Sequence, residues 1–125
     1  MIYFISGHRD ISAENFKKYY VPMILDAISK DDQASFVVGD CKGVDSMAQT
    51  FIAAINPDLI TVYHMLDKPR CLARPGIKTV GGFKDDVSRD AAMTEISNKD
   101  IAVIGKGRWT SGTAQNILRR YERDM

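Results

Sequence analysis

One turn in this chain has residue types that bind small anionic or hydroxylated molecules. Gly39 and Gly43 bracket the turn, with Asp40 inside it and Asp45 shortly after it. Glycines let backbone N–H groups approach an anion closely, and an aspartate can accept a hydrogen bond from a sugar hydroxyl. The alternative interpretation is a tight turn in which Asp45 caps the following helix. The spacing matches neither a Walker A loop nor a GxGxxG dinucleotide fingerprint, so we expect no cofactor.

Two other segments carry similar chemistry. Ser111-Gly112-Thr113 precedes a helical pattern, and its hydroxyls and unpaired N–H groups would suit a phosphate at the positive end of a helix. Arg108 and Trp109 come just before it and could hold a phosphate and stack on a base or sugar. Near the start of the chain, Ser6-Gly7-His8-Arg9 places an arginine that could clamp a phosphate or carboxylate. An ordinary helix cap and an ordinary surface loop would give the same patterns.

Other reactive side chains favour neither a metal site nor a thiol nucleophile. The two histidines, His8 and His64, lack metal-ligand spacing, so we expect no metal. Cys41 lies beside Lys42 at a predicted helix start, which could lower the pKa of its thiol. The alternative is that Cys41 is a small residue packed in a turn.

The elements that must position these residues follow from hydrophobic patterning. Apolar runs predict buried strands, and periods of three to four predict helices between them. The strands are expected over residues 2–5, 35–38, 59–65 and 100–104. Strands that alternate with helices and show little polar alternation predict an α/β/α sandwich of three layers with a mainly parallel sheet of four to five strands. In such sheets ligands bind beyond the carboxyl ends of the strands, so the loops at 6–12, 39–45, 65–82 and 105–113 should share one edge.

Two segments interrupt this pattern. Residues 67–82 have no clear period, which indicates either a functional lid or a secondary-structure element that the pattern does not reveal, and we prefer the lid. Pro22 lies inside the first helical pattern, where a missing backbone N–H should kink or divide the helix.

Composition predicts a single domain over residues 1–125. The net charge of +1 argues against nucleic-acid and polybasic membrane binding, and no apolar run approaches the ~20 residues of a membrane span. We expect a cytoplasmic protein with reduced thiols. Many of the lysines and arginines fall in the predicted edge loops, so a balanced total can conceal a basic pocket.

Four motifs together resemble those of the SLOG superfamily. They are Ser6-Gly7-His8-Arg9, the turn from Gly39 to Ala48, the segment Arg89–Met93, and Ser111-Gly112-Thr113. The superfamily is a group of Rossmann-like domains that includes DNA-processing protein A, the lonely-guy phosphoribohydrolases and YspA-like proteins. The resemblance covers nearly the whole chain. It implies a Rossmann-like fold, a nucleotide-like small-molecule ligand, an Arg89 side chain that faces the pocket, and a homodimer. From its residues alone, Arg89 could simply pair with Asp85 or Asp86 at helical spacing, which is the commoner outcome for a charged surface helix.

One departure from the family pattern bears on activity. In the phosphoribohydrolases, and in the related nucleoside 2-deoxyribosyltransferases, the last motif leads to a glutamate that acts on the ribose or the glycosidic bond. Asn116 follows the motif here, and an amide supplies no negative charge for that chemistry. The favoured hypothesis is therefore a nucleotide-binding sensor or sequestering module. The alternative is an enzyme that cleaves or transfers at an N-glycosidic bond, with Asp45 or Glu95 as the candidate catalytic carboxylate.

Overall fold

The computed structural model describes residues 1–125 and contains one sheet of five parallel strands. The strand order is β4-β3-β2-β1-β5. The strands are β1 (Ile2–Ser6), β2 (Ser35–Val38), β3 (Ile60–Met65), β4 (Lys78–Phe83) and β5 (Lys99–Ala102). The helices are α1 (Ala13–Lys30), α2 (Val44–Ile55), α3 (Asp86–Ile96) and α4 (Gly112–Asp124), with a short 3₁₀ helix, η1, at Pro57–Leu59.

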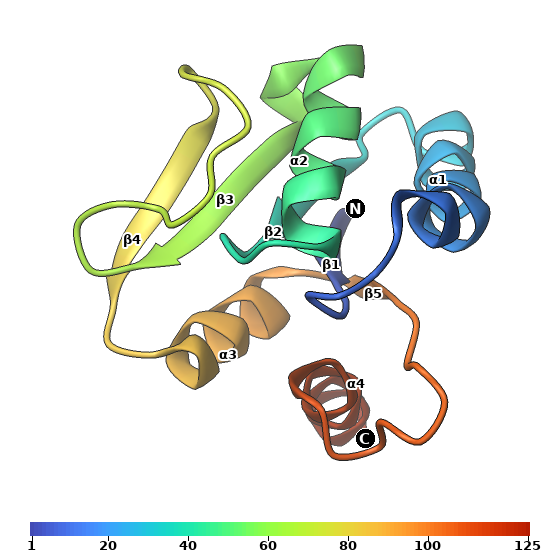
Figure 1. The fold of residues 1–125 in the computed structure, drawn as a ribbon, viewed down its shortest axis with the longest axis vertical. Coiled ribbons are helices and arrows are strands. Elements are labelled where there is room, and N and C mark those ends of the chain that lie inside the picture. The colour runs from blue at the N-terminus through green and yellow to red at the C-terminus, as the bar shows by residue number, and fades with distance from the viewer.

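The sheet forms the middle of three layers, which confirms the predicted Rossmann-like α/β/α architecture. Helices α1 and α2 cover one face, and α3 and α4 cover the other (Figure 1). Neighbouring residues in a strand point to opposite faces. In β1, Ile5 therefore joins the core beneath α1 and α2, whereas Phe4 packs with Met93 of α3. Because both faces are covered, the central strands have almost no polar alternation.

The segment predicted as a lid is only partly a loop. Its C-terminal part forms β4, which pairs with β3 at the edge of the sheet in a register from Thr61↔Lys78 to Met65↔Phe83. Residues 78–82 are all exposed, so this strand lacks the apolar run by which the other strands could be predicted. Gly81 also passes the His64 ring so closely that a Cβ there would lie 2.2 Å from Cε1. The preferred interpretation of 67–82 as a lid was therefore wrong for residues 78–82, where the alternative of an unrecognised element is correct.

Helix α1 is not divided at its proline. The Ser12 side chain caps the helix by accepting the Asn15 N–H at 3.0 Å. Pro22 lies inside the helix, which continues through it as one element. The buried face of α1 holds the helix on the sheet, and the Tyr20 hydroxyl on that face donates to the Ser6 carbonyl at 2.8 Å. Tertiary packing thus offsets the hydrogen bond that proline removes.

No helix of the structure combines the length and the apolar character that crossing a membrane requires.

Candidate functional site

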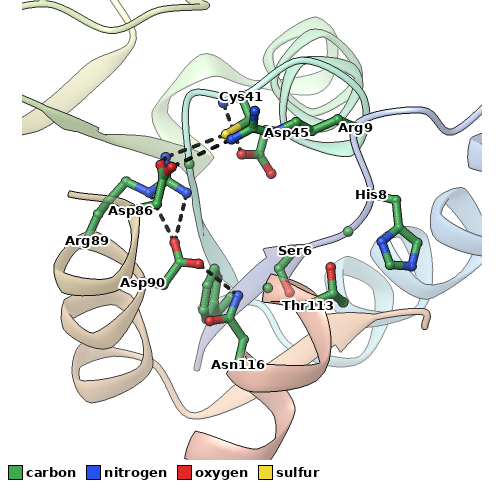
Figure 2. A pocket seen from close by; sticks show the side chains of 14 residues that line it. Ser6, His8, Arg9, Cys41, Asp45, Asp86, Arg89, Asp90, Thr113 and Asn116 are labelled. Atoms are coloured by element: carbon green, nitrogen blue, oxygen red, sulfur yellow. Dashed lines mark hydrogen bonds and ion pairs between the residues drawn. The ribbon is translucent and has the colours of Figure 1, made fainter. Parts of the chain in front are cut away.

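A polar cavity of about 250 Å³ lies at the carboxyl edge of the sheet, between the ends of β1 and β2 and the helices α3 and α4 (Figure 2). It adjoins the place where the strand order reverses, because the chain proceeds from β1 through β4 in one direction and then returns to β5 on the other side of β1. Ligands of open α/β sheets bind at such reversals. The lining residues are Phe4, Ser6, Gly7, His8, Arg9, Gly39, Cys41, Asp45, Asp86, Arg89, Asp90, Gly112, Thr113 and Asn116.

The loop after β1 forms one wall of the cavity. Gly7 is required there because a Cβ would lie 2.4 Å from both the Tyr20 hydroxyl and a Val44 methyl group. The Ser6 side chain lies beneath this wall, and its Oγ is buried without any hydrogen-bond partner. His8 accepts the Gly105 N–H at Nε2 over 2.7 Å, and burial is the main cause that lowers the pKa of its ring. His8 is therefore neutral at physiological pH, with the proton assigned to Nδ1.

The glycine-rich turn after β2 is shaped by contacts within the protein. At Gly39 a Cβ would lie 2.7 Å from Asp45 Oδ2 and 2.8 Å from Arg89 Cζ. Gly43 has φ 81°, and a Cβ there would lie 2.5 Å from the His8 and Arg9 carbonyl oxygens. The Val44 N–H, at the start of α2, donates to the His8 carbonyl at 3.3 Å. Both glycines thus have a structural role that needs no ligand, and their contact with an anion stays a prediction.

Asp45 does not cap α2, whose start has no side-chain cap, but it holds the preceding turn and lines the cavity. Its Oδ2 accepts the Cys41 N–H at 3.1 Å, which ties the turn together. Its Oδ1 makes no hydrogen bond within the protein, and the carboxyl group points into the cavity (Figure 2). Burial raises the pKa of Asp45 to about 7, although the nearby charge of Arg89 opposes this shift. Near neutral pH the group therefore exchanges between a hydrogen-bond acceptor and a donor.

The side chain of Arg89 is buried, and its guanidinium is fully engaged by carboxylates. Nη1 lies 2.8 Å from Asp40 Oδ1 and 3.0 Å from Asp86 Oδ1, while Nη2 lies 2.9 Å from Asp90 Oδ1. The sequence suggested either a ligand contact or a pair at helical spacing. The structure has the pair with Asp86, adds two stronger partners, and still places Arg89 in the cavity wall.

Asp40 lies behind this wall and connects it to the loop after β3. It accepts the Arg70 backbone N–H at 2.7 Å and pairs with the Arg70 guanidinium at 2.9 Å. Burial disfavours the charged form of Asp40, but the hydrogen bonds from Arg70, together with the charges of Arg70 and Arg89, outweigh it. The pKa of Asp40 is therefore held below its ordinary value. Asp40 is fully buried and lines no part of the cavity, so its predicted contact with a ligand has no geometric support.

The start of α4 faces the cavity from the opposite side. The Ser111 side chain caps the helix by accepting the Ala114 N–H at 3.2 Å. The N–H groups of Gly112 and Thr113 make no hydrogen bond within the protein, and both residues line the cavity. One turn further on, Asn116 donates to Asp90 Oδ2 at 3.0 Å. A carboxylate thus lies next to the amide at position 116.

Six predicted site residues are not among those that line the cavity: Asp40, Gly43, Glu95, Arg108, Trp109 and Ser111. The guanidinium of Arg108 pairs with Asp10 through two contacts, at 2.6 and 2.7 Å. Trp109 is 73% exposed, and Glu95 lies on the exposed surface of α3. Arg9, 57% exposed, is the cationic side chain at the cavity mouth, with only a 3.6 Å contact to Asp86.

Other residues of the site were missed from the sequence. Asp86 and Asp90 are carboxylates on α3 one helical turn apart, a spacing that could have suggested a shared face. Arg70 was predicted only as one of several basic residues in the edge loops, and Phe4 had no recognisable signal, because only the tertiary fold brings it to the site. Burial raises the pKa of the Cys41 thiol. This shift is opposite to the lowered pKa that the sequence suggested from the neighbouring Lys42.

No group of three or more His, Cys, Asp or Glu side chains is arranged to hold a metal ion. Comparison of the chain with protein-family models, with curated proteins and with solved structures found no significant match in any of the three.

Proposed function

We propose that the protein binds a nucleotide, or a small molecule derived from one, in the cavity at the carboxyl edge of the sheet. The observation that carries the proposal is the polar cavity itself, placed at the reversal of strand order and open to the start of α4. Rossmann-like sheets use this place for ligands that carry phosphate. The motifs that resemble those of the SLOG superfamily lie around the same cavity.

The free N–H groups of Gly112 and Thr113 support an anion at the α4 end of the cavity. Unpaired N–H groups at a helix start carry partial positive charge and bind phosphate. Arg9 lies at the mouth and is free to turn toward such a group. The start of α2 is less suitable, because the Val44 N–H is already bonded to His8 and the Asp45 carboxylate in the cavity would repel an anion there.

A panel of nucleoside mono-, di- and triphosphates tests the proposal by thermal shift and isothermal titration calorimetry. We expect at least one nucleotide to raise the Tm and to bind with a measurable heat. Arg9→Ala should weaken binding, whereas Arg108→Ala should not, because Arg108 pairs with Asp10 outside the cavity. If no nucleotide binds, or if both variants bind as tightly as wild type, the proposal fails.

A second candidate function is cleavage or transfer at an N-glycosidic bond. The observation that favours it is the pair of aspartates in the cavity, with Asp90 hydrogen-bonded to the amide of Asn116 and Asp45 carrying a free oxygen. Following free-base release from nucleosides and nucleotides separates an enzyme from a binding module. Under the enzyme hypothesis, Asp45→Asn should abolish release and Glu95→Gln should not, because Glu95 lies outside the cavity. Nucleotide binding without any base release would refute this second candidate.

A further inference from the structure

One part of the cavity, which we call the inner end, is lined by Ser6 and Asp45 and has hydrogen-bonding groups with no partner in the protein. The structure has two buried side-chain oxygens that lack any hydrogen bond, Ser6 Oγ and Thr94 Oγ1, and only Ser6 lines the cavity. A buried hydroxyl without a partner costs free energy, so such groups are rare in folded proteins and call for an explanation. Asp45 adds a second unsatisfied atom, because its Oδ1 faces the cavity while its Oδ2 holds the Cys41 N–H.

Figure 2 shows Ser6 and the Asp45 carboxyl group on two sides of one open space, with the Ser6 hydroxyl directed toward the start of α4, beside Thr113. These groups come from the end of β1, the start of α2 and the start of α4, so the fold rather than local sequence brings them together. A hydroxyl and a carboxyl group on two sides of one small space match a ligand that both donates and accepts hydrogen bonds there.

The charges at this end do not suit a phosphate. The buried cation that lines the cavity, Arg89, is already held by three aspartates. A phosphate could reach Arg89 only by displacing one of these carboxylates, and it would lie against the others. The anionic part of a ligand is better accommodated by the free backbone N–H groups of Gly112 and Thr113 at the start of α4.

The inner end does not suit a nucleobase either. Only two of the 14 lining residues are hydrophobic, and Phe4 is the single aromatic among them. The volume of about 250 Å³ is also below the roughly 300–1,000 Å³ of cavities that enclose whole drug-sized ligands. A sugar phosphate fits both the volume and the polarity, which would leave a base at the open mouth.

We infer that Ser6 and Asp45 recognise the hydroxyl groups of a ribose, so that the site selects ribonucleotides or ribose phosphates over their 2-deoxy counterparts. This inference rests on the proposed function and adds the sugar class of its ligand. A site built to hydrogen-bond a hydroxyl rejects analogues that lack it, because its own buried groups are then left unpaired. Each hydroxyl of a ribose can donate to the Asp45 carboxyl and accept from Ser6.

Calorimetric titration with matched ligand pairs tests the inference. The pairs are the four ribonucleoside 5′-monophosphates with their 2′-deoxy forms, and ribose 5-phosphate with 2-deoxyribose 5-phosphate. We expect the ribo form that binds best to bind at least about 100-fold more tightly than its deoxy counterpart. In Ser6→Ala and Asp45→Asn this preference should fall by at least about tenfold, through weaker binding of the ribo form.

Thr94→Val is the matched control, because it removes the other buried unpaired hydroxyl, which lies on α3 outside the cavity. This variant should keep the full preference. Asp45→Asn retains an oxygen that can accept the Cys41 N–H, and Ser6→Ala removes no hydrogen bond, so both variants should fold.

Equal affinity for the ribo and deoxy forms would overturn the inference and leave nucleotide binding intact. If both Ser6→Ala and Asp45→Asn keep the full preference for ribo over deoxy ligands, the inference is also overturned, because other residues must then recognise the sugar hydroxyls. If the ribonucleotides, the deoxyribonucleotides and the two sugar phosphates all fail to bind, the proposed function fails as well.

Discussion

The ionisation of Asp45 should make the stability of the protein depend on pH in a way that one substitution removes. Burial raises the pKa of this carboxyl group from 3.8 to about 7 in the folded state. The folded protein therefore holds a proton that the unfolded chain releases between those two pH values. The free energy of unfolding should accordingly fall as the pH rises from about 4, and it should stop falling once the pH is above about 7.

The size of this effect follows from the shift. Each tenfold change in proton affinity corresponds to about 1.4 kcal/mol, so the full cost of ionising Asp45 approaches about 4 kcal/mol above pH 8. Between pH 5 and pH 8 the cost should grow by about 3 kcal/mol, because much of the unfolded-state titration is already complete at pH 5. Asp45→Asn has no such titration but keeps an acceptor for the Cys41 N–H.

Urea denaturation of wild type and Asp45→Asn, followed by circular dichroism at pH 5, 6, 7 and 8, measures this cost. Other titrating groups, His8 included, are shared by both proteins and largely cancel in the difference. The variant should gain about 3 kcal/mol relative to wild type across this range. A difference that stays constant with pH would refute the reasoning and would mean that Arg89 keeps Asp45 ionised with an ordinary pKa.

Three further substitutions test the packing around the cavity, each by urea denaturation. Arg89→Met should cost about 3–5 kcal/mol, because it leaves the fully buried carboxylate of Asp40 without its buried partner; a loss below 1 kcal/mol would contradict that role. Gly39→Ala should destabilise the protein by about 1–3 kcal/mol, because the added Cβ would lie within 3 Å of Asp45 and Arg89. Gly112→Ala is the control and should not destabilise the protein, because a Cβ there would have no atom within 4 Å. Equal effects of the two substitutions would contradict the crowding at the turn. Tyr20→Phe should cost about 2–4 kcal/mol, since its buried hydroxyl bonds two backbone groups, and a neutral effect would mean that water replaces those bonds.

The sequence predicted four of the five strands because those strands are apolar. Strands buried on both faces, such as β1 and β2, have apolar runs that end at polar turns. Strand β4 has one covered edge and two exposed faces, so its residues, with adjacent glycines among them, resemble a loop. The helical period was similarly informative for α1, although it could not show that packing of Tyr20 would carry the helix past Pro22.

The candidate site was predictable where a motif follows a strand. Ser6, Gly39, Asp45 and Thr113 were all named from their positions in predicted edge loops, and all four line the cavity. What the sequence could not reveal is how charges pair across the fold.

The pairing of charges decides which cations face the cavity. Arg108 looked like a free cation but pairs with Asp10, 98 residues away. Arg89 looked like a ligand contact but holds three carboxylates. Arg89 and Arg108 are thus neutralised by aspartates, and Arg9 is the exposed cation at the mouth of the cavity.

Mapping of backbone amide chemical shifts during titration with the nucleotide that binds best would test most directly where a nucleotide binds. If the proposal holds, the largest shifts will cluster around the cavity, at Gly7, Gly39, Gly112 and Thr113. Shifts that centre instead on the apolar groove between α1 and α2, around Phe16 and Phe51, would contradict it, as would the absence of any shift at saturating nucleotide.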